Sequence, residues 1–159
     1  IKEENLLKKN KNKINYVSYR FGTISGVSKG MRFHTAINKF CLCAVLGKPL
    51  PVWKGMMNKP RPYLSLADAF KVFKFTIENN FFQNDIFNIV SQNLILKKII
   101  AYLKKNKSEI KIKYEKSKLI NQYSYKVSNK KITKKGLIIK SSIFKDINST
   151  LRMLKNINY

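Results

Sequence analysis

Residues 16–24 read YVSYRFGTI, a segment that alternates in hydrophobicity and is rich in β-branched and aromatic residues, which predicts a β-strand. Glycines then recur at every fourth position as far as Gly30 and indicate a loop. Over 31–46 the apolar residues are spaced alternately three residues and one residue apart, which predicts an amphipathic helix that Gly47 ends. A strand, a loop and a helix in this order are typical of a mixed α/β chain.

Outward from this segment, strands and helices continue to alternate. Ser65 or Asp68 is expected to cap a helix that runs to about Glu78. Four apolar residues of that helix are expected to face inward: Ala69, Phe70, Phe73 and Ile77. The remaining expected elements are helices over 2–9, 94–103 and 147–157, a helical turn over 130–135, and extended segments over 50–53, 62–66, 85–90 and 111–114.

The length of 159 residues fits one ordinary domain or a large piece of a bigger protein. No apolar run approaches the roughly 18 residues of a membrane span, so no membrane partner is expected. Cys41 and Cys43, the only cysteines, fit neither a disulfide framework nor a four-ligand zinc site, which favours a reducing, cytoplasmic location. The chain opens with Ile1 and a helix-like segment, so we expect it to be the C-terminal part of a longer protein.

A formal net charge of +25 raises the question of nucleic-acid binding, because clustered basic side chains release counterions from phosphates. Only four of the 33 basic residues are Arg, however. Lysine is typical of solvated surface, whereas base and phosphate recognition favour arginine. We therefore do not expect nucleic acid as a partner. A basic nucleic-acid-binding module is kept as the alternative function, and a degenerate structural remnant as a third.

No complete catalytic or metal-binding motif is present. Tyr114 and Lys118 have the Tyr-x-x-x-Lys spacing of a catalytic pair, but they follow an expected edge strand in a lysine-dense region, which favours coincidence. His34 is the only histidine, and no second ligand stands at metal-binding spacing from it. The glycines do not match G-x-G-x-x-G. No catalytic residue and no metal ligand is therefore assigned.

The rare arginines are candidates for binding an anion. Arg61 lies between Pro60 and Pro62 directly before a strand, where a guanidinium can form two parallel hydrogen bonds to a phosphate. Arg20 lies in the first strand, and Arg32 at the start of the expected 31–46 helix. For each arginine taken alone, an ion pair or a solvated position is an equal alternative.

Five segments, taken in chain order, resemble the C-terminal half of the extended short-chain dehydrogenase/reductase family, the NAD-dependent nucleotide-sugar epimerases and dehydratases. They cover essentially the whole chain in the order found in the family. The segments are YRFGTISGVSKGMRF (19–33), LGKPLPVWKG (46–55), KPRPYLSLADAF (59–70), NDIFNIVSQN (84–93) and SYKVSNKKITKKGLIIKSSIFKDI (124–147).

The resemblance implies an α/β fold made of the smaller substrate-binding domain plus the last strands and helices of an extended Rossmann-type sheet, with residues 1–159 as the C-terminal fragment. The dinucleotide-binding glycines and the catalytic helix would precede Ile1. NAD or NADP would be bound mainly by that missing N-terminal half, which is an expected partner beside the nucleotide-sugar substrate. A homodimer is compatible with the resemblance. The implied function is substrate binding in an epimerase or dehydratase, with no activity expected of the fragment alone.

The resemblance also implies substrate-binding residues, position by position. Thr23 occupies the position where many relatives have an Asn that contacts the sugar nucleotide. Arg61 matches the arginine that binds the diphosphate in the family. The segment 50–53 matches the strand beside the base. The full set is Thr23, Arg32, Phe33, Pro51, Val52, Trp53, Arg61 and Tyr63.

Three departures from the family pattern leave the substrate open. Thr23 replaces the usual Asn, residues 91–93 (SQN) replace Gly-Ser-Gly, and a second phosphate-binding arginine expected near 121–125 is missing. Because Arg61 and the LPVW segment are retained, nucleotide-sugar chemistry is favoured over the flavonoid or steroid chemistry of other members.

Overall fold

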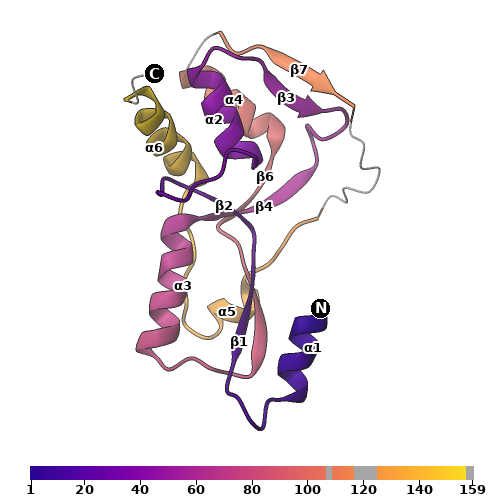
Figure 1. Cartoon of the computed structure of the whole chain (residues 1–159), viewed down its shortest axis with the longest axis vertical. Coiled ribbons are helices and arrows are strands. Elements are labelled where there is room, and N and C mark those ends of the chain that lie inside the picture. The colour runs from indigo at the N-terminus through magenta and orange to yellow at the C-terminus, as the bar shows by residue number, and fades with distance from the viewer. Residues whose placement is uncertain (107–108, 117–124, 157–159) are drawn as a thin grey trace.

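The computed structural model describes residues 1–106, 109–116 and 125–156, which form a mixed α/β fold (Figure 1). The helices are α1 (Lys2–Lys9), α2 (Ala36–Val45), α3 (Leu66–Glu78), α4 (Leu96–Asn106), α5 (Lys130–Thr133) and α6 (Ile143–Lys155). The strands are β1 (Val17–Phe21), β2 (Thr23–Ser25), β3 (Leu50–Trp53), β4 (Pro60–Ser65), β5 (Asp85–Ile89), β6 (Gln92–Ile95) and β7 (Ile112–Glu115). Every expected element has a counterpart, and β6 is an additional strand.

Parallel pairing dominates the strand contacts. Strand β1 pairs with β5 and β3 with β7, both in parallel. Strand β4 lies between β2, to which it is parallel, and β6, to which it is antiparallel. In Figure 1, β3 and β7 lie in the upper part with α2 and α4, whereas β1 and α3 lie below the β2–β4 pair. The sheet containing β4 therefore joins the two ends of the molecule.

The expected strand over 16–24 is broken at Gly22, where the chain leaves one sheet and enters another. The amide of Gly22 still donates to the carbonyl oxygen of Ile89, at 2.9 Å. A Cβ atom at this position would lie only 3.0 Å from the carbonyl oxygen of Pro62. Glycine is therefore required because β1–β2 and β4 approach each other backbone to backbone.

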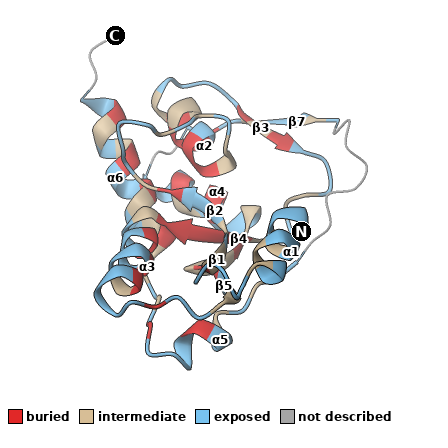
Figure 2. Ribbon diagram, turned by 60° about the horizontal axis from the view of Figure 1, so that its bottom comes forward, coloured by how far each residue is buried: buried red, intermediate tan, exposed pale blue. Residues whose placement is uncertain are grey.

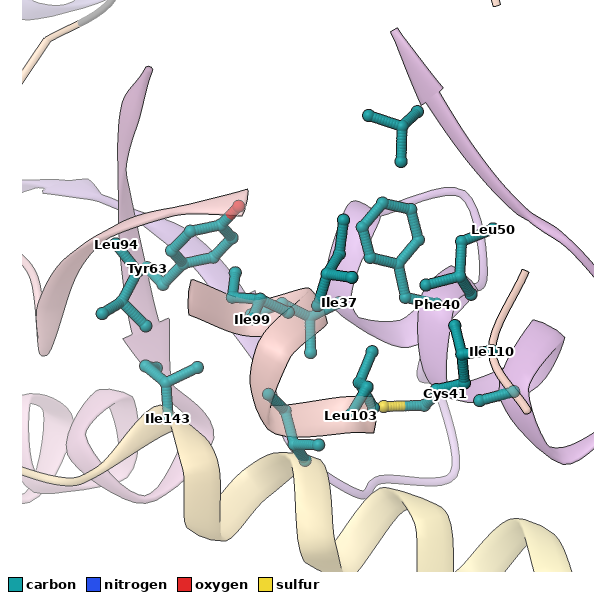
Figure 3. Close-up of a cluster of buried hydrophobic side chains, with 14 of the residues drawn as sticks. Ile37, Phe40, Cys41, Leu50, Tyr63, Leu94, Ile99, Leu103, Ile110 and Ile143 are labelled. Carbon is teal, nitrogen blue, oxygen red and sulfur yellow. The ribbon is translucent and has the colours of Figure 1, made fainter. Parts of the chain in front are cut away.

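Two groups of buried side chains form the interior. The larger one lies between α2, α4, α6, β3 and β4 (Figure 3), and includes Ile37, Phe40, Leu50, Tyr63 and Leu103. The smaller one lies around β5 and α3 and includes Leu64, Val72, Phe87, Ile89 and Ile132. Figure 2 shows β4 as a buried strand near the middle of the molecule. Adjacent residues of β4 thus contribute to different cores.

Cys41 belongs to the larger core. Its side chain is fully buried, and burial raises the pKa of the thiol to about 12. The thiol is therefore protonated at physiological pH and serves as a small apolar side chain.

The expected helix over 31–46 begins later, at Ala36, so that prediction was wrong for its first turn. Arg32, Phe33 and His34 precede the helix instead of lying on it. The side-chain amide of Asn38 donates to the carbonyl oxygen of Arg32 at 3.0 Å, which holds the preceding loop against the first turn. At the other end of the chain, α6 begins at Ile143, four residues before the expected start at 147.

The inward face of α3 also differs from the prediction. Phe70, Phe73 and Ile77 are more than half exposed, and only Ala69 of the expected set is buried. Buried polar residues set the orientation instead, since Asp68 accepts hydrogen bonds from the Ser141 segment. Hydrogen-bonded polar groups can thus determine which helix face is buried, because leaving them unpaired in the interior is costly.

Candidate functional site

A pocket of about 350 Å³ opens between the larger core and the β3–β7 pair. This volume is near the lower end of the roughly 300–1,000 Å³ typical of small-molecule sites. Side chains from several elements and two loops line it: Thr23, His34, Thr35, Ala36, Lys39, Phe40, Pro51, Trp53, Met56, Lys59, Arg61, Tyr63, Leu96 and Glu115.

Most of the residues expected to bind substrate reach this pocket. The five that line it are Thr23, Pro51, Trp53, Arg61 and Tyr63. Three others do not. Val52 is fully buried, because successive residues of a strand point to opposite faces and its neighbours Pro51 and Trp53 face the pocket. Arg32 is exposed outside the pocket, and Phe33 packs against the larger core.

A tight turn arranges the lining residues along one wall. The amide of Met56 donates to the carbonyl oxygen of Trp53 at 3.1 Å, and the amide of Lys59 donates to that of Met56 at 3.2 Å. Strand β4 then continues through Arg61 to Tyr63, whose partner in the β2–β4 register is Thr23. In chain order the pocket-lining side chains here are therefore an indole (Trp53), two cationic groups (Lys59 and Arg61) and a phenol (Tyr63), with the hydroxyl of Thr23 on the adjacent strand.

The pocket has an excess of positive charge. Among the described residues that line it, Lys39, Lys59 and Arg61 stand against a single carboxylate, that of Glu115. The guanidinium carbon of Arg61 lies 5.7 Å from the ring centroid of Tyr125, within cation–π range. Several cations around one small cavity favour an anionic ligand with more than one negative oxygen.

The hydroxyl of Tyr63 is kept neutral in this setting. Burial raises the pKa of Tyr63 to about 12, and the positive charge of Arg61 offsets only part of that effect. The phenol is therefore protonated at physiological pH and can act as a hydrogen-bond donor.

No protein-family model matches the chain, and no curated protein matches it significantly in sequence. Solved structures, however, are similar. The match to Thermus thermophilus UDP-glucose 4-epimerase in complex with NAD has a TM-score of 0.80 at 14% identity, over 96% of this chain and 51% of that one. The chain has the fold of half an epimerase/dehydratase.

Two further enzymes of this kind lead to the same conclusion. Bacillus cereus UDP-glucuronic acid 4-epimerase matches with a TM-score of 0.84 at 16% identity, over 96% of this chain and 49% of that one. Streptomyces venezuelae dTDP-glucose 4,6-dehydratase matches with a TM-score of 0.80 at 13% identity, over 94% and 47%. The chain spans about half the length of these structures, which confirms the predicted partial extended Rossmann-type fold.

Sequence reasoning missed several residues that line the pocket. Lys39 and Lys59 could not be singled out among so many lysines. Glu115 lay inside the Tyr114–Lys118 pattern, and its place beside Trp53 depends on the β3–β7 register. The one available signal was the negative charge of Glu115, because acidic residues are rare in this chain, which has only 8 of them.

The remaining candidate motifs of the chain have other roles. Arg20 forms two hydrogen bonds to the carboxylate of Glu4, with Nε and Oε1 2.7 Å apart, and so joins β1 to α1. Tyr114 is exposed on strand β7, where a helical Tyr-x-x-x-Lys pair cannot form. Lys118 and residues 121–124, where a second arginine was expected, lie outside the described residues.

Two absences apply to the described residues, 1–106, 109–116 and 125–156. No group of three or more His, Cys, Asp or Glu side chains in them is placed to hold a metal ion. None of their helices is both long enough and apolar enough to cross a membrane.

Proposed function

We propose that residues 1–159 form the substrate-binding C-terminal half of an NAD(P)-dependent nucleotide-sugar epimerase or dehydratase acting in the cytoplasm. The observation that carries the proposal is the order, along β3, β4 and the neighbouring β2, of side chains that line the pocket. Trp53 ends β3, Arg61 and Tyr63 follow on β4, and Thr23 on β2 is the register partner of Tyr63. A nucleotide sugar has the matching order of an aromatic base, a diphosphate and a polyhydroxylated sugar.

The diphosphate would lie at Arg61, Lys39 and Lys59. A guanidinium can pair with two phosphate oxygens at once, and the lysines add charge without fixed geometry. Pro60 and Pro62 restrict the backbone on either side of Arg61, and the Tyr125 ring contacts its guanidinium. This arrangement limits the conformational entropy that Arg61 loses when ligand binds.

The base would stack on Trp53, and the sugar would lie near Tyr63 and Thr23. The side chain of Trp53 is 37% exposed, so part of its ring surface is available for stacking. Base–aromatic stacking contributes about 1–3 kcal/mol per base. The neutral phenol of Tyr63 and the hydroxyl of Thr23 match the hydrogen-bonding groups of a sugar.

The edge of β1 supports the proposal that an N-terminal half completes the fold. Within the described part of the chain, β1 pairs only with β5, in parallel. Parallel sheets normally contain more strands and are covered on both faces, so a two-stranded parallel pair is incomplete by itself. The missing strands would lie beside β1 and belong to the dinucleotide-binding half.

The cofactor would be NAD or NADP, which supplies hydride transfer when bound. The glycines of this chain do not form the G-x-G-x-x-G motif of a dinucleotide site, and Gly22 and Gly26 are required by close packing within this half instead. A Cβ at Gly22 would meet the Pro62 carbonyl oxygen at 3.0 Å, and one at Gly26 would meet the Leu66 Cβ at 3.0 Å. We therefore assign no cofactor contact in this half, and binding would be mainly to the N-terminal half.

Trp53 provides the test, because it is the only tryptophan in the chain and lines the pocket. Titration of the protein with UDP-glucose, UDP, dTDP and GDP should change its tryptophan fluorescence in a saturable way. Uridine and guanosine, which lack the diphosphate, should bind at least tenfold more weakly. Absence of a saturable change with every nucleoside diphosphate would contradict the proposal.

A further inference from the structure

Among the described residues that line the pocket, Glu115 carries the one carboxylate, and it lies beside Trp53. In the parallel β3–β7 pair, Trp53 and Glu115 are register partners, and both side chains line the pocket. The amide of Lys54 donates to the carbonyl oxygen of Glu115 at 3.0 Å, so the backbone hydrogen bonding between β3 and β7 extends to this position. The carboxylate is therefore carried by a hydrogen-bonded strand end and not by an unsupported loop.

Glu115 differs from most acidic residues of this basic chain. Glu4 pairs with Arg20, Glu78 with Lys74 and Asp85 with Lys131. Within the described residues, the side chain of Glu115 has no such ion pair, although it is half-buried. A half-buried carboxylate next to an aromatic ring has acceptor capacity that a ligand can use.

The nucleobases differ in what they offer to a carboxylate. An ionised carboxylate accepts hydrogen bonds and cannot donate them. Guanine carries a ring N–H beside an exocyclic amino group, so two adjacent donors match its two oxygens. Uracil and thymine carry a single N–H between two carbonyl oxygens, which the carboxylate would repel. Adenine and cytosine place an unprotonated ring nitrogen beside their amino group.

We propose that Glu115 makes this pocket selective for guanine, so that the sugar is carried on GDP. The proposal rests on the proposed function, since it assumes that a nucleotide base stacks on Trp53. Guanine would gain two charge-assisted hydrogen bonds, whereas uracil would leave the carboxylate desolvated and unpaired. Selection then comes as much from the penalty on the wrong base as from the contacts to the right one.

The test compares nucleotides by the fluorescence of Trp53. GDP should bind at least about tenfold more tightly than UDP or dTDP, because a good bidentate contact discriminates by about 1–3 kcal/mol. Inosine diphosphate, which keeps the ring N–H and lacks the amino group, should fall between GDP and UDP. Glu115→Gln should weaken GDP binding about tenfold and change UDP binding little, whereas Glu109→Gln, at an exposed residue outside the pocket, should change neither.

The possible results separate the two proposals. If no nucleoside diphosphate binds, both the proposed function and guanine selection are wrong. If UDP binds as tightly as GDP, the nucleotide site stands and guanine selection is wrong. If Glu115→Gln weakens all nucleotides equally, the carboxylate contacts the shared ribose. If it strengthens all of them equally, the carboxylate only repels the diphosphate, and either result overturns guanine selection.

Discussion

Asp68 on α3 accepts hydrogen bonds from both the backbone amide and the hydroxyl of Ser141, at 2.8 and 2.7 Å. The same carboxylate accepts from the hydroxyl of Ser91 at 2.7 Å and from the ammonium of Lys71 at 3.0 Å. Its side chain is fully buried. A single carboxylate thus connects three segments that are far apart in the sequence, and Asp146 forms a similar centre close by with Ser25 and Ser65.

Asp68→Asn should lower the free energy of unfolding by about 2–4 kcal/mol at pH 7, since hydrogen bonds to a buried charge are lost. Burial by itself raises the pKa of Asp68, but hydrogen bonds from Ser141, Ser91 and Lys71 outweigh it and the pKa lies below its usual value. This stabilisation is therefore present above about pH 4 and is lost as pH falls through the lowered pKa. Urea unfolding at several pH values should show the two proteins converging in acid.

Asp146→Asn is the matched control. Burial raises the pKa of Asp146, the nearby charge of Asp68 adds to this, and the two serine hydroxyls oppose it. Its contribution to stability is fully present below the unfolded pKa and is lost as pH rises through the raised folded pKa. Asp146→Asn should therefore cost less than Asp68→Asn at pH 7, and an equal or larger cost would contradict this account.

Gly22→Ala should destabilise the protein by about 1–3 kcal/mol, which is the usual range for overpacking. The added Cβ would meet Pro62 and Tyr63 only through backbone atoms, at 3.0–3.2 Å, and backbone cannot rotate away. Gly30→Ala is the control, because nothing lies within 4 Å of its added Cβ. Thermal unfolding of both variants measures the difference, and equal melting temperatures would disprove the close approach at Gly22.

Arg61→Lys should weaken nucleotide-sugar binding although the charge is kept, because an ammonium cannot replace a two-pronged guanidinium. The loss of a charge-assisted hydrogen bond suggests about 1–3 kcal/mol. Arg152→Lys, at an exposed position on α6, should leave binding unchanged. Calorimetric titration decides the matter, and equal affinities of Arg61→Lys and the unaltered protein would remove Arg61 from the site.

The chain by itself should not turn over a nucleotide sugar in the presence of NAD. Tyr114 is more than half exposed on a strand, and the sequence contains no G-x-G-x-x-G motif for a dinucleotide. Incubation with UDP-glucose or GDP-mannose, followed by chromatography of the products, is the measurement. Turnover that Tyr114→Phe abolishes would show that the 114–118 pattern is catalytic after all.

Local patterns were sufficient for the type and order of the elements. The three-and-one spacing before Gly47 specifies a helix, and Pro51 favours an extended segment over 50–53. The element ends were harder to predict. The start of α2 depends on the contact of Asn38 with the Arg32 carbonyl, and β6 forms because β4 is available to pair with it.

The sequence by itself determined the elements, the fold class and the residues that share one face of β3 and of β4, because strand alternation is a local property. Val52 could have been excluded on that ground. Only the tertiary structure decided which face of α3 is buried and that Glu115 lies beside Trp53. The first depends on hydrogen bonds from Ser141 to Asp68, and the second on the β3–β7 register. Both interactions join residues that are far apart along the chain. The local sequence pattern around either residue therefore does not reveal them.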